Sequence, residues 1–597
     1  MTVKEKVEAL RQKMAERGIA AYFVQSSDFH QSEYLAPHFT ERAWLTGFTG
    51  SAGVAVVTAD EALVWADGRY TIQAKNQLAG TPFKPMPWLS SPDAITPQAW
   101  LKQKLNRGDK LGYCGAYTSP LIYANWLKPL MDQGVELIED IDLVGEIWED
   151  RPEMAATTVF ELPIEYSGES TADKLQRVRE AMRERAVDYT ALASLDDVAW
   201  LYNIRGRDIE DNPVIFAYAL IGEQTAVLYT EVLRVPEEIK ELLAKDGVEI
   251  RPYEAIYEDL TKLPSDAVFY YDPERFNRLL VKAIPAGMKC KQGLNFTSQF
   301  KAIKNSTEEA KQRIAYHLDA IALTKFMYWL DQEIADKGRK ITEYEASEYL
   351  LSLREQADSF IEPSFTTIAA YGPNAAMMHY APDPENSPVI EPRGLFLFDS
   401  GGQYFEGTTD ITRTQAMGEL TAEERLAYTY TWKSCLTLLN GRFLQGSTGS
   451  GLDSIARYPL WQIGEDYKCG TGHGVGFCLN VHEGPQRLGF KPNSVELEEG
   501  MVVTVEPGVY KEGKFGIRIE NVCIVKKDIK NDAGQFMKLD ILDYIPHDTR
   551  PIVVEELTDA ELAWINAYQA RCYEELKDKL SSEEAAWLKE FCKPLER

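Results

Sequence analysis

The sequence predicts a mixed α/β (α+β) protein in which two related α/β domains precede a C-terminal domain of different character. Helix-period and strand-period segments alternate in the first half of the chain, as an α/β domain requires. A pattern near the N-terminus returns 168 residues later, and residues 306–309 (STEE) carry a capping-box signature before a long helical segment. We therefore predict three domains, at residues 1–155, 156–305 and 306–597.

The first domain is expected to open with a helix followed by strands. Val7, Leu10 and Met14 recur at helical spacing, and Gly18 marks a helix end. Strands are predicted where apolar and β-branched residues dominate, at residues 20–24 (AAYFV), 53–58 (GVAVVT) and 62–65 (ALVW).

The opening of the chain recurs in diverged form. Residues 5–7 (EKV) correspond to 173–175 (DKL), and 16–17 (ER) correspond to 184–185 (ER). A single duplication explains this pattern better than a solenoid, which needs several short repeats. The polar, proline-containing segment at 148–153 is the expected linker between the two copies.

In the C-terminal domain, the first pair of predicted strands carries two carboxylates. Residues 395–399 (LFLFD) form an apolar run that ends at Asp399, and residues 408–414 (TTDITRT) are rich in β-branched residues around Asp410. If the two segments pair as an antiparallel hairpin, Asp399 and Asp410 lie beside each other across the ladder.

A second pair of predicted strands adds two more carboxylates. Residues 501–506 (MVVTVE) end at Glu506, before a Pro-Gly turn. Residues 516–521 (GIRIEN) alternate with period two, which places Arg518 and Glu520 on one face.

Four carboxylates at the ends of buried strands need compensation, because an unpaired charge in a low dielectric is costly. Two divalent cations would balance the four negative charges, activate water and polarise a carbonyl. Oxygen ligands with one imidazole suit a hard or borderline ion, and we expect manganese. The alternative is that each carboxylate lies in an ordinary turn or surface ion pair, which the ordered set disfavours.

The composition and charge of the chain restrict the cellular locations and binding partners that we expect. The net charge is −28, from 64 basic and 92 acidic residues, which disfavours binding to nucleic acid or to an anionic membrane. The N-terminus lacks the apolar core of a signal peptide, and no run of about 18 apolar residues predicts a membrane span. The eight cysteines form no CxxC pair, so we expect reduced thiols and a cytoplasmic location.

The ordered motifs resemble those of the pita-bread metallopeptidases, and more closely those of the long, three-domain cytosolic Xaa-Pro aminopeptidases, also called aminopeptidase P. The motifs are DSGGQY, GTTDITRT, GTGHGVG, NVHEGP, VEPGVY and GIRIEN, joined outside the site by HQSEYLAP, LTGFTGSAG, ADGRY and LYNIRGRDIEDNPV. The resemblance covers nearly the entire chain. It implies two creatinase-type N-terminal domains, a pita-bread catalytic domain, and a homodimer formed through that domain.

The same resemblance implies an activity and a set of metal ligands. The reaction is removal of the first residue from a peptide whose second residue is proline, by attack of a hydroxide that bridges two metal ions, most simply Mn²⁺. Glu506 would also move a proton, and the bound Xaa-Pro bond is expected to be trans. The implied metal ligands are Asp399, Asp410, His473, Glu506 and Glu520.

Other residues keep two interpretations. His379 alone suits a structural or surface role, whereas the family match makes it a substrate-contacting histidine. His482 is expected to contact the scissile carbonyl or its tetrahedral successor, because imidazole donates a proton or hydrogen bond near neutral pH. Arg518 either neutralises neighbouring carboxylates or shapes the substrate pocket. Arg69 and Glu33 help to bind peptide from the N-terminal domain, or have ordinary surface roles.

Cys469 departs from the family pattern, which often has histidine four residues before the metal-binding one. The thiol could be a small buried hydrophobe, a weaker hydrogen-bond donor or an adventitious ligand, and we favour the first. The departure puts the substrate contact at this position in doubt, but not the five ligands.

Three rival functions remain. A binding protein that keeps the fold but has lost catalysis is disfavoured by the retained ligand set. A methionine aminopeptidase is disfavoured by the duplicated N-terminal domains. A metal-free, creatinase-like amidinohydrolase is disfavoured by the carboxylates.

Overall fold

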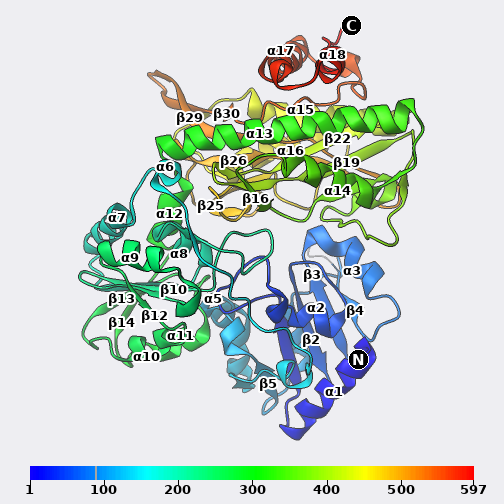
Figure 1. Cartoon of the computed structure of the whole chain (residues 1–597). Coiled ribbons are helices and arrows are strands. Elements are labelled where there is room, and N and C mark those ends of the chain that lie inside the picture. Colours follow the sequence, from blue (N-terminus) through cyan, green and yellow to red (C-terminus); the bar gives the residue numbers. More distant parts are fainter. Residues whose placement is uncertain (88–90) are drawn as a thin grey trace. The chain divides into compact units, whose positions relative to one another are not determined.

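The computed structural model describes residues 1–87 and 91–597 and confirms the mixed helix-and-sheet architecture (Figure 1). The chain divides into two compact units. The predicted domain boundaries at residues 155 and 305 stay predictions. Unit 1 comprises Met1–Ile164 and Glu169–Gln299, and unit 2 comprises Glu165–Gly168 and Phe300–Arg597.

The first half of unit 1 is a six-stranded mixed sheet. Helix α1 (Val3–Glu16) begins with a capping box between Thr2 and Glu5, and it buries the predicted apolar stripe against the sheet. The strand order is β4-β3-β2-β1-β5-β6, with antiparallel β1–β2 and β2–β3 pairs and parallel pairs elsewhere. The strands are β1 (Ala21–Gln25), β2 (Gly53–Thr58), β3 (Ala62–Ala66), β4 (Lys84–Pro85), β5 (Lys110–Tyr113) and β6 (Glu136–Ile138).

The second half of unit 1 repeats this topology. Helix α7 (Thr171–Glu184) takes the place of α1, and the order β12-β11-β10-β8-β13-β14 has the same pattern of parallel and antiparallel neighbours. The duplication predicted from the sequence therefore has a structural counterpart. The strands are β8 (Tyr189–Leu192), β10 (Tyr218–Gly222), β11 (Ala226–Tyr229), β12 (Glu249–Arg251), β13 (Val268–Tyr271) and β14 (Lys289–Gln292).

A buried histidine joins the two halves of unit 1. Nδ1 of His30 lies 2.7 Å from the carbonyl oxygen of Ala193, and Nε2 lies 2.6 Å from the hydroxyl of Tyr253. Burial lowers the pKa of His30, although Asp28 acts in the opposite direction. The neutral ring is therefore part of the packing between the halves.

Unit 2 begins with the long helix α13 (Ser306–Leu330), whose N-cap differs from the prediction. Asn305 caps the helix, and its side chain accepts hydrogen bonds from the backbone N–H groups of Thr307 and Glu308. Glu308 closes the capping box, so the box starts one residue earlier than predicted at 306–309. Asparagine caps as well as serine does, and the local sequence allowed both.

Two sheets form the centre of unit 2. One has the order β17-β19-β22 and the other β23-β30-β29-β26, and both contribute apolar residues to one continuous core. The strands are β17 (Ile368–Tyr371), β19 (Leu395–Ser400), β22 (Ile411–Ala416), β23 (Phe443–Leu444), β26 (Val502–Val505), β29 (Asn521–Asn531) and β30 (Gly534–Ile541).

Helices cover these sheets, and the C-terminal tail packs on its own unit. Helix α17 (Asp559–Leu576) begins with a capping box between Thr558 and Glu561, and its Ile565 and Tyr568 join the core of unit 2. Figure 1 shows α17 and α18 as a layer beside α13. The remaining long helices are α14 (Glu343–Arg354), α15 (Ala422–Leu439), α16 (Gly449–Gln462), α17 (Asp559–Leu576) and α18 (Ser582–Phe591).

Membrane-spanning character is absent from the helices that the structure describes: none combines sufficient length with sufficient apolar character.

Candidate metal centre

The predicted hairpin that carries Asp399 and Asp410 is present, but the two aspartates are not directly opposite each other. Strands β19 and β22 pair antiparallel, and Asp399 lies opposite Thr412, while Asp410 immediately precedes β22. The loop between them folds into a smaller hairpin of β20 (Gly402–Tyr404) and β21 (Gly407–Thr408), which brings the chain into β22 one residue after Asp410. The two aspartates are therefore diagonal neighbours, which still interact across a ladder.

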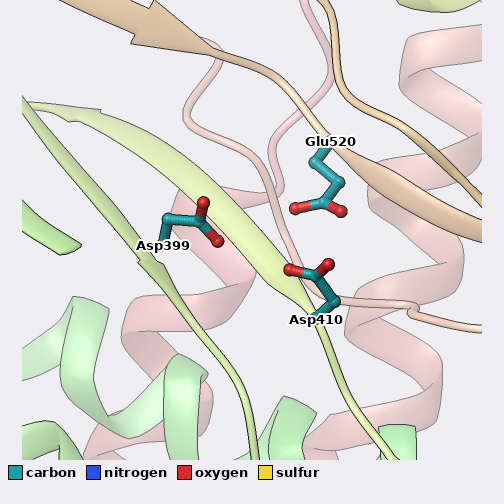
Figure 2. Close-up of side chains that lie close together, drawn as sticks. All are labelled: Asp399, Asp410 and Glu520. Atoms are coloured by element: carbon teal, nitrogen blue, oxygen red, sulfur yellow. The ribbon is translucent and has the colours of Figure 1, made fainter. Parts of the chain in front are cut away.

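Glu520 completes a cluster of three buried carboxylates. One oxygen from each of Asp399, Asp410 and Glu520 lies within 4.8 Å of the others. Figure 2 shows the three carboxylates pointing toward one another. The backbone N–H of Thr412 donates to Glu520 Oε2 over 2.5 Å, which joins the glutamate to the aspartate hairpin.

Glu520 lies where the chain passes from one ladder to another. The segment predicted as a single strand is divided between β28 (Phe515–Arg518) and β29, with Ile519 and Glu520 between them. Strand β28 pairs with β27 (Gly508–Lys511), whereas β29 pairs with β26. This break directs the Glu520 side chain into the cluster.

His473 and Glu506 lie at the edge of this cluster. His473 belongs to β24 (Gly472–Gly474), and its Nε2 lies 3.4 Å from Asp410 Oδ2 and 3.3 Å from Glu506 Oε1. Its Nδ1 lies 2.8 Å from the carbonyl oxygen of Gly474. A proton on Nδ1 donates to that carbonyl, and the lone pair of Nε2 then faces the carboxylates of Asp410 and Glu506, which is the usual orientation of a metal-binding histidine.

The charges of this cluster need cations. Burial, reinforced by the neighbouring carboxylates, raises the pKa of Asp410 and of Glu520 well above the usual range. Oδ1 of Asp399 and Oε1 of Glu520 are buried without a hydrogen-bond partner in the described structure. A set of carboxylate oxygens with one imidazole nitrogen fits hard or borderline divalent ions. The residues present therefore fit the metal pair that the sequence predicts.

Arg518 is buried against the same cluster. Its guanidinium is paired with Asp399 Oδ2, and it also donates to the hydroxyls of Tyr510 (2.8 Å) and Thr412 (3.0 Å). Burial alone would raise the pKa of Glu506, but His473 and Arg518 outweigh it and the pKa is lowered. These contacts favour the neutralising interpretation of Arg518; a pocket-shaping role stays a prediction.

The two candidate substrate-contacting histidines lie near His473. The rings of His482 and His473 are 4.3 Å apart at their centroids in an edge-on arrangement, and those of His379 and His482 are 6.4 Å apart. The loop that carries His379 is held by its neighbour Tyr380, whose hydroxyl donates to the buried Glu343 over 2.6 Å. Three histidines from separate motifs thus converge beside the carboxylates.

Arg69 and Glu33 lie together in unit 1. Nη1 of Arg69 is 3.4 Å from Glu33 Oε1, and Nε is 2.8 Å from Asp67 Oδ1. Asp67 is a partner that the sequence interpretation did not assign. The contribution of Arg69 and Glu33 to peptide binding stays a prediction.

Cys469 lies half-buried against the apolar core of unit 2. Its backbone carbonyl accepts a hydrogen bond from Arg457 Nη2 over 2.6 Å. The carboxylate group that could hold a metal, among the residues described, does not include this thiol. The position therefore agrees with a packing role.

The structure shows a buried ion pair, Arg354–Asp319, near the two aspartates of the cluster. Neither residue belongs to a motif found in the sequence. Arg354 Nε lies 2.6 Å from Asp319 Oδ1, and Arg354 Nη2 donates to the Ser400 hydroxyl over 3.0 Å. Asp319 in turn accepts from the hydroxyl of Thr409. The pair thus holds the residues next to Asp399 and Asp410. Only a charged residue on the apolar face of a predicted helix could have signalled it.

The architecture matches known family descriptions over most of the chain. A Creatinase/Prolidase N-terminal domain matches twice, at residues 6–151 and 150–308. Metallopeptidase family M24 matches residues 310–527, and the C-terminal region of peptidase M24 matches residues 535–595. Fold and site together define a metallopeptidase.

Comparison with individual proteins narrows the class. Aminopeptidase P1 of Lotus japonicus is 34% identical over 98% of this chain and 99% of its own length. Xaa-Pro aminopeptidase 1 of Dictyostelium discoideum is 34% identical over 100% of this chain and 97% of its own. The X-prolyl aminopeptidase of Caenorhabditis elegans, described as a cytosolic enzyme with a di-nuclear active site, superposes with a TM-score of 0.95 at 34% identity, covering 100% of both chains. The chain belongs to metallopeptidase family M24 and, within it, to the Xaa-Pro aminopeptidases.

Proposed function

We propose that this protein is a cytoplasmic, two-metal aminopeptidase that hydrolyses the bond between an N-terminal residue and a following proline. The convergence of Asp399, Asp410 and Glu520, with buried oxygens that lack partners, carries the proposal. The full-length similarity to Xaa-Pro aminopeptidases supplies the substrate class, and the di-nuclear active site described for the Caenorhabditis elegans enzyme supports the number of metals.

Five residues would hold the metals, and we expect Mn²⁺. When bound, two divalent cations make hydroxide available near neutral pH and polarise the scissile carbonyl. The chain supplies four negative charges for the two cations, and the Gly474 carbonyl orients the imidazole. The proposed ligands are Asp399, Asp410, His473, Glu506 and Glu520.

Three side chains have proposed roles in the reaction itself. Glu506 accepts a proton from the attacking water and passes it toward the departing proline nitrogen. His482 donates a hydrogen bond to the oxygen that becomes negative as the carbonyl is attacked. His379, whose ring neighbours that of His482, contacts the peptide. Arg518 holds Asp399 in place through their ion pair.

Specificity for proline follows from its missing amide hydrogen. A pocket shaped for the proline ring need not offer an acceptor at that position. An ordinary residue would bury an unpaired N–H, at a cost of about 1–3 kcal/mol. At ~1.4 kcal/mol per tenfold change in rate, this cost corresponds to roughly 5- to 150-fold discrimination.

The test is a panel of Xaa-Pro-Yaa and Xaa-Ala-Yaa peptides, assayed with added Mn²⁺ and with a chelator. We expect release of the first residue from the proline peptides, with kcat/KM at least about tenfold higher than for the alanine peptides. Chelation should abolish turnover, and N-acetylation should suppress it. Equal cleavage of proline and alanine peptides, or ready cleavage of acetylated ones, would overturn the proposal. Metal binding without turnover would point instead to a binding protein.

We also propose that the protein forms a homodimer through unit 2. Ile455, Tyr458 and Trp461 on α16 are 51%, 60% and 47% exposed and recur at spacings of three residues on one helical face. Phe490, which is 55% exposed, lies against Arg457 of the same helix. Exposed apolar groups that gather in this way are typical of an interface.

Light scattering after size-exclusion chromatography tests the dimer. The wild-type protein should have twice the mass of one chain, and Trp461→Glu should shift it to one chain mass. Leu233→Glu is the matched control, because Leu233 is 92% exposed in unit 1. A monomeric wild-type protein, or an unchanged mass for Trp461→Glu, would contradict the proposed interface.

A further inference from the structure

Two buried lysines hold one buried carboxylate directly after His482. Lys301 Nζ lies 3.3 Å from Glu483 Oε2, and Lys304 Nζ is paired with Glu483 Oε1. The three side chains are only 2%, 1% and 1% exposed. Because each carboxylate oxygen has its own lysine, Glu483 is fixed from two directions.

The segment that carries these lysines opens unit 2 and is itself anchored. Lys304 Nζ donates to the carbonyl of Lys301 over 2.8 Å, and the backbone N–H of Lys304 donates to the carbonyl of Gly500 over 2.9 Å. Ile303 forms a β-bridge with Met501. Met501 leads into β26, which ends just before Glu506. The lysines are therefore tied to the strand that delivers Glu506.

Glu483 is tied to the strand that delivers His473. It begins β25 (Glu483–Leu488), which pairs antiparallel with β24, and Glu483 lies opposite Gly474 at a register shift. A Cβ at Gly474 would lie 2.3 Å from the carbonyl oxygen of Glu483, so the two backbones are pressed together. A displacement of Glu483 therefore moves the residues on either side of this contact.

The residues on either side are the two histidines. His482 precedes Glu483 and His473 precedes Gly474, and their rings meet at 4.3 Å between centroids. A shift of the Glu483 backbone would therefore move the His482 imidazole relative to His473. Catalytic groups tolerate little error in placement, since a shift of about 1 Å can cost about 100-fold in rate.

We propose that Lys301, Lys304 and Glu483 are positioning residues for His482. They hold the Glu483 backbone, and through it they keep the preceding imidazole where it can donate to the developing oxyanion. The inference rests on the proposed function, which makes His482 a substrate-contacting group. A cluster that only stabilises the fold would instead act on activity independently of His482.

A double-mutant cycle separates these two roles. Lys301→Met and Glu483→Gln are made singly and each in combination with His482→Ala, and Lys311→Met is the matched control. Lys311 lies in α13, and its Nζ is 4.4 Å from the centroid of the Tyr166 ring. Each protein is assayed for kcat and KM on an Xaa-Pro-Yaa peptide, for bound Mn²⁺, and for its urea midpoint.

If the cluster positions His482, changing the cluster should lower kcat only while the His482 imidazole is present. Lys301→Met should lower kcat about tenfold, and Glu483→Gln about 10- to 100-fold, while the Mn²⁺ content stays at the wild-type value. In the His482→Ala background the same changes should alter kcat less than about threefold. Lys311→Met should match the wild type in both backgrounds.

The outcomes that overturn the inference are distinct. Equal losses of kcat in the two backgrounds would show that the cluster acts only through the fold, and a parallel loss of Mn²⁺ would show that it acts through the metal ligands. Full activity of His482→Ala would overturn both the role of His482 in the proposed function and this inference. If Glu483→Gln does not fold, Lys301→Met still decides the question, because it leaves the Lys304–Glu483 pair intact.

Discussion

Two groups of buried charged side chains lie on opposite faces of strand β22. They differ in how their charges are compensated. On one side, Asp399, Asp410 and Glu520 converge, and one guanidinium, that of Arg518, pairs with Asp399. On the other side, Arg413 pairs with Asp543 at 3.0 Å. The adjacent β22 residues Thr412 and Arg413 point to opposite faces of the strand, as successive strand residues do, so the two groups are back to back.

In the group formed by Arg413 and Asp543, other protein atoms supply the hydrogen-bond partners and the counter-charge. Asp543 accepts from the side chain of Asn521 and from the backbone N–H of Val522, and Arg413 donates to the carbonyl of Glu520 and to Asp543. Tyr568 of α17 donates to the carbonyl of Ile545. Burial still raises the pKa of Asp543 to about 6. This group holds unit 2 together, whereas the carboxylate cluster needs ligands that the chain does not contain.

The largest effect is expected from breaking the compensated group. Asp543→Asn leaves Arg413 buried without its counter-charge, which costs about 3–5 kcal/mol of unfolding free energy. Urea denaturation measures this loss, with the exposed Asp532→Asn as the control. The folded fraction should keep its wild-type Mn²⁺ stoichiometry. An unchanged urea midpoint would show that the two groups do not differ as described.

Breaking the carboxylate cluster, whose charges the chain compensates only in part, should reduce metal binding and turnover and leave the fold intact. Asp410→Asn removes a charged ligand, so bound Mn²⁺ should fall and kcat should drop at least about 100-fold, or about 2.7 kcal/mol. In chelator the variant should be as stable as the wild type or more so, because like-charge repulsion is relieved. Metal analysis, peptide hydrolysis and thermal unfolding test this. Near-wild-type activity with unchanged Mn²⁺ content would refute the assignment.

His30 is a third kind of buried group, neutral and hydrogen-bonded. It should make the stability of the fold depend on pH. The lowered pKa of His30 means that the unfolded chain binds its proton more readily than the fold does. Stability should therefore fall as the pH drops below about 6.5, by no more than about 1.4 kcal/mol per pH unit. Urea denaturation between pH 7.5 and 5 should show a shallower dependence for His30→Gln. If the unfolding free energies of the wild type and of His30→Gln fell equally with pH, His30 would not be the source of this dependence.

The smallest effect is expected at Cys469. If the thiol only packs, Cys469→Ala should keep kcat and Mn²⁺ content within about threefold of the wild type, and thiol reagents should not release metal. Cys469→His should change KM more than it changes metal content. Peptide kinetics and metal analysis check both variants. Loss of metal from Cys469→Ala would make the thiol a ligand.

Much of the architecture could be predicted because its signals are local. The duplication appears as a recurring pattern, and both copies have the same strand order. Alternation within residues 516–521 predicted that Arg518 and Glu520 share a face, and both reach the carboxylate cluster. The capping box predicted at the start of α13 forms one residue earlier, at Asn305, because adjacent residues offered equivalent caps.

The sequence by itself determined which chemical groups gather, since residue type and spacing within a strand establish which side chains share a face. Only the tertiary structure decided which of those charges are compensated. Arg413 meets Asp543 across 130 residues of chain, and Lys301 meets Glu483 across 182. No local period links such partners. They are chosen by the packing of separate helices and strands, where a buried charge persists only beside a counter-charge or a bound ion.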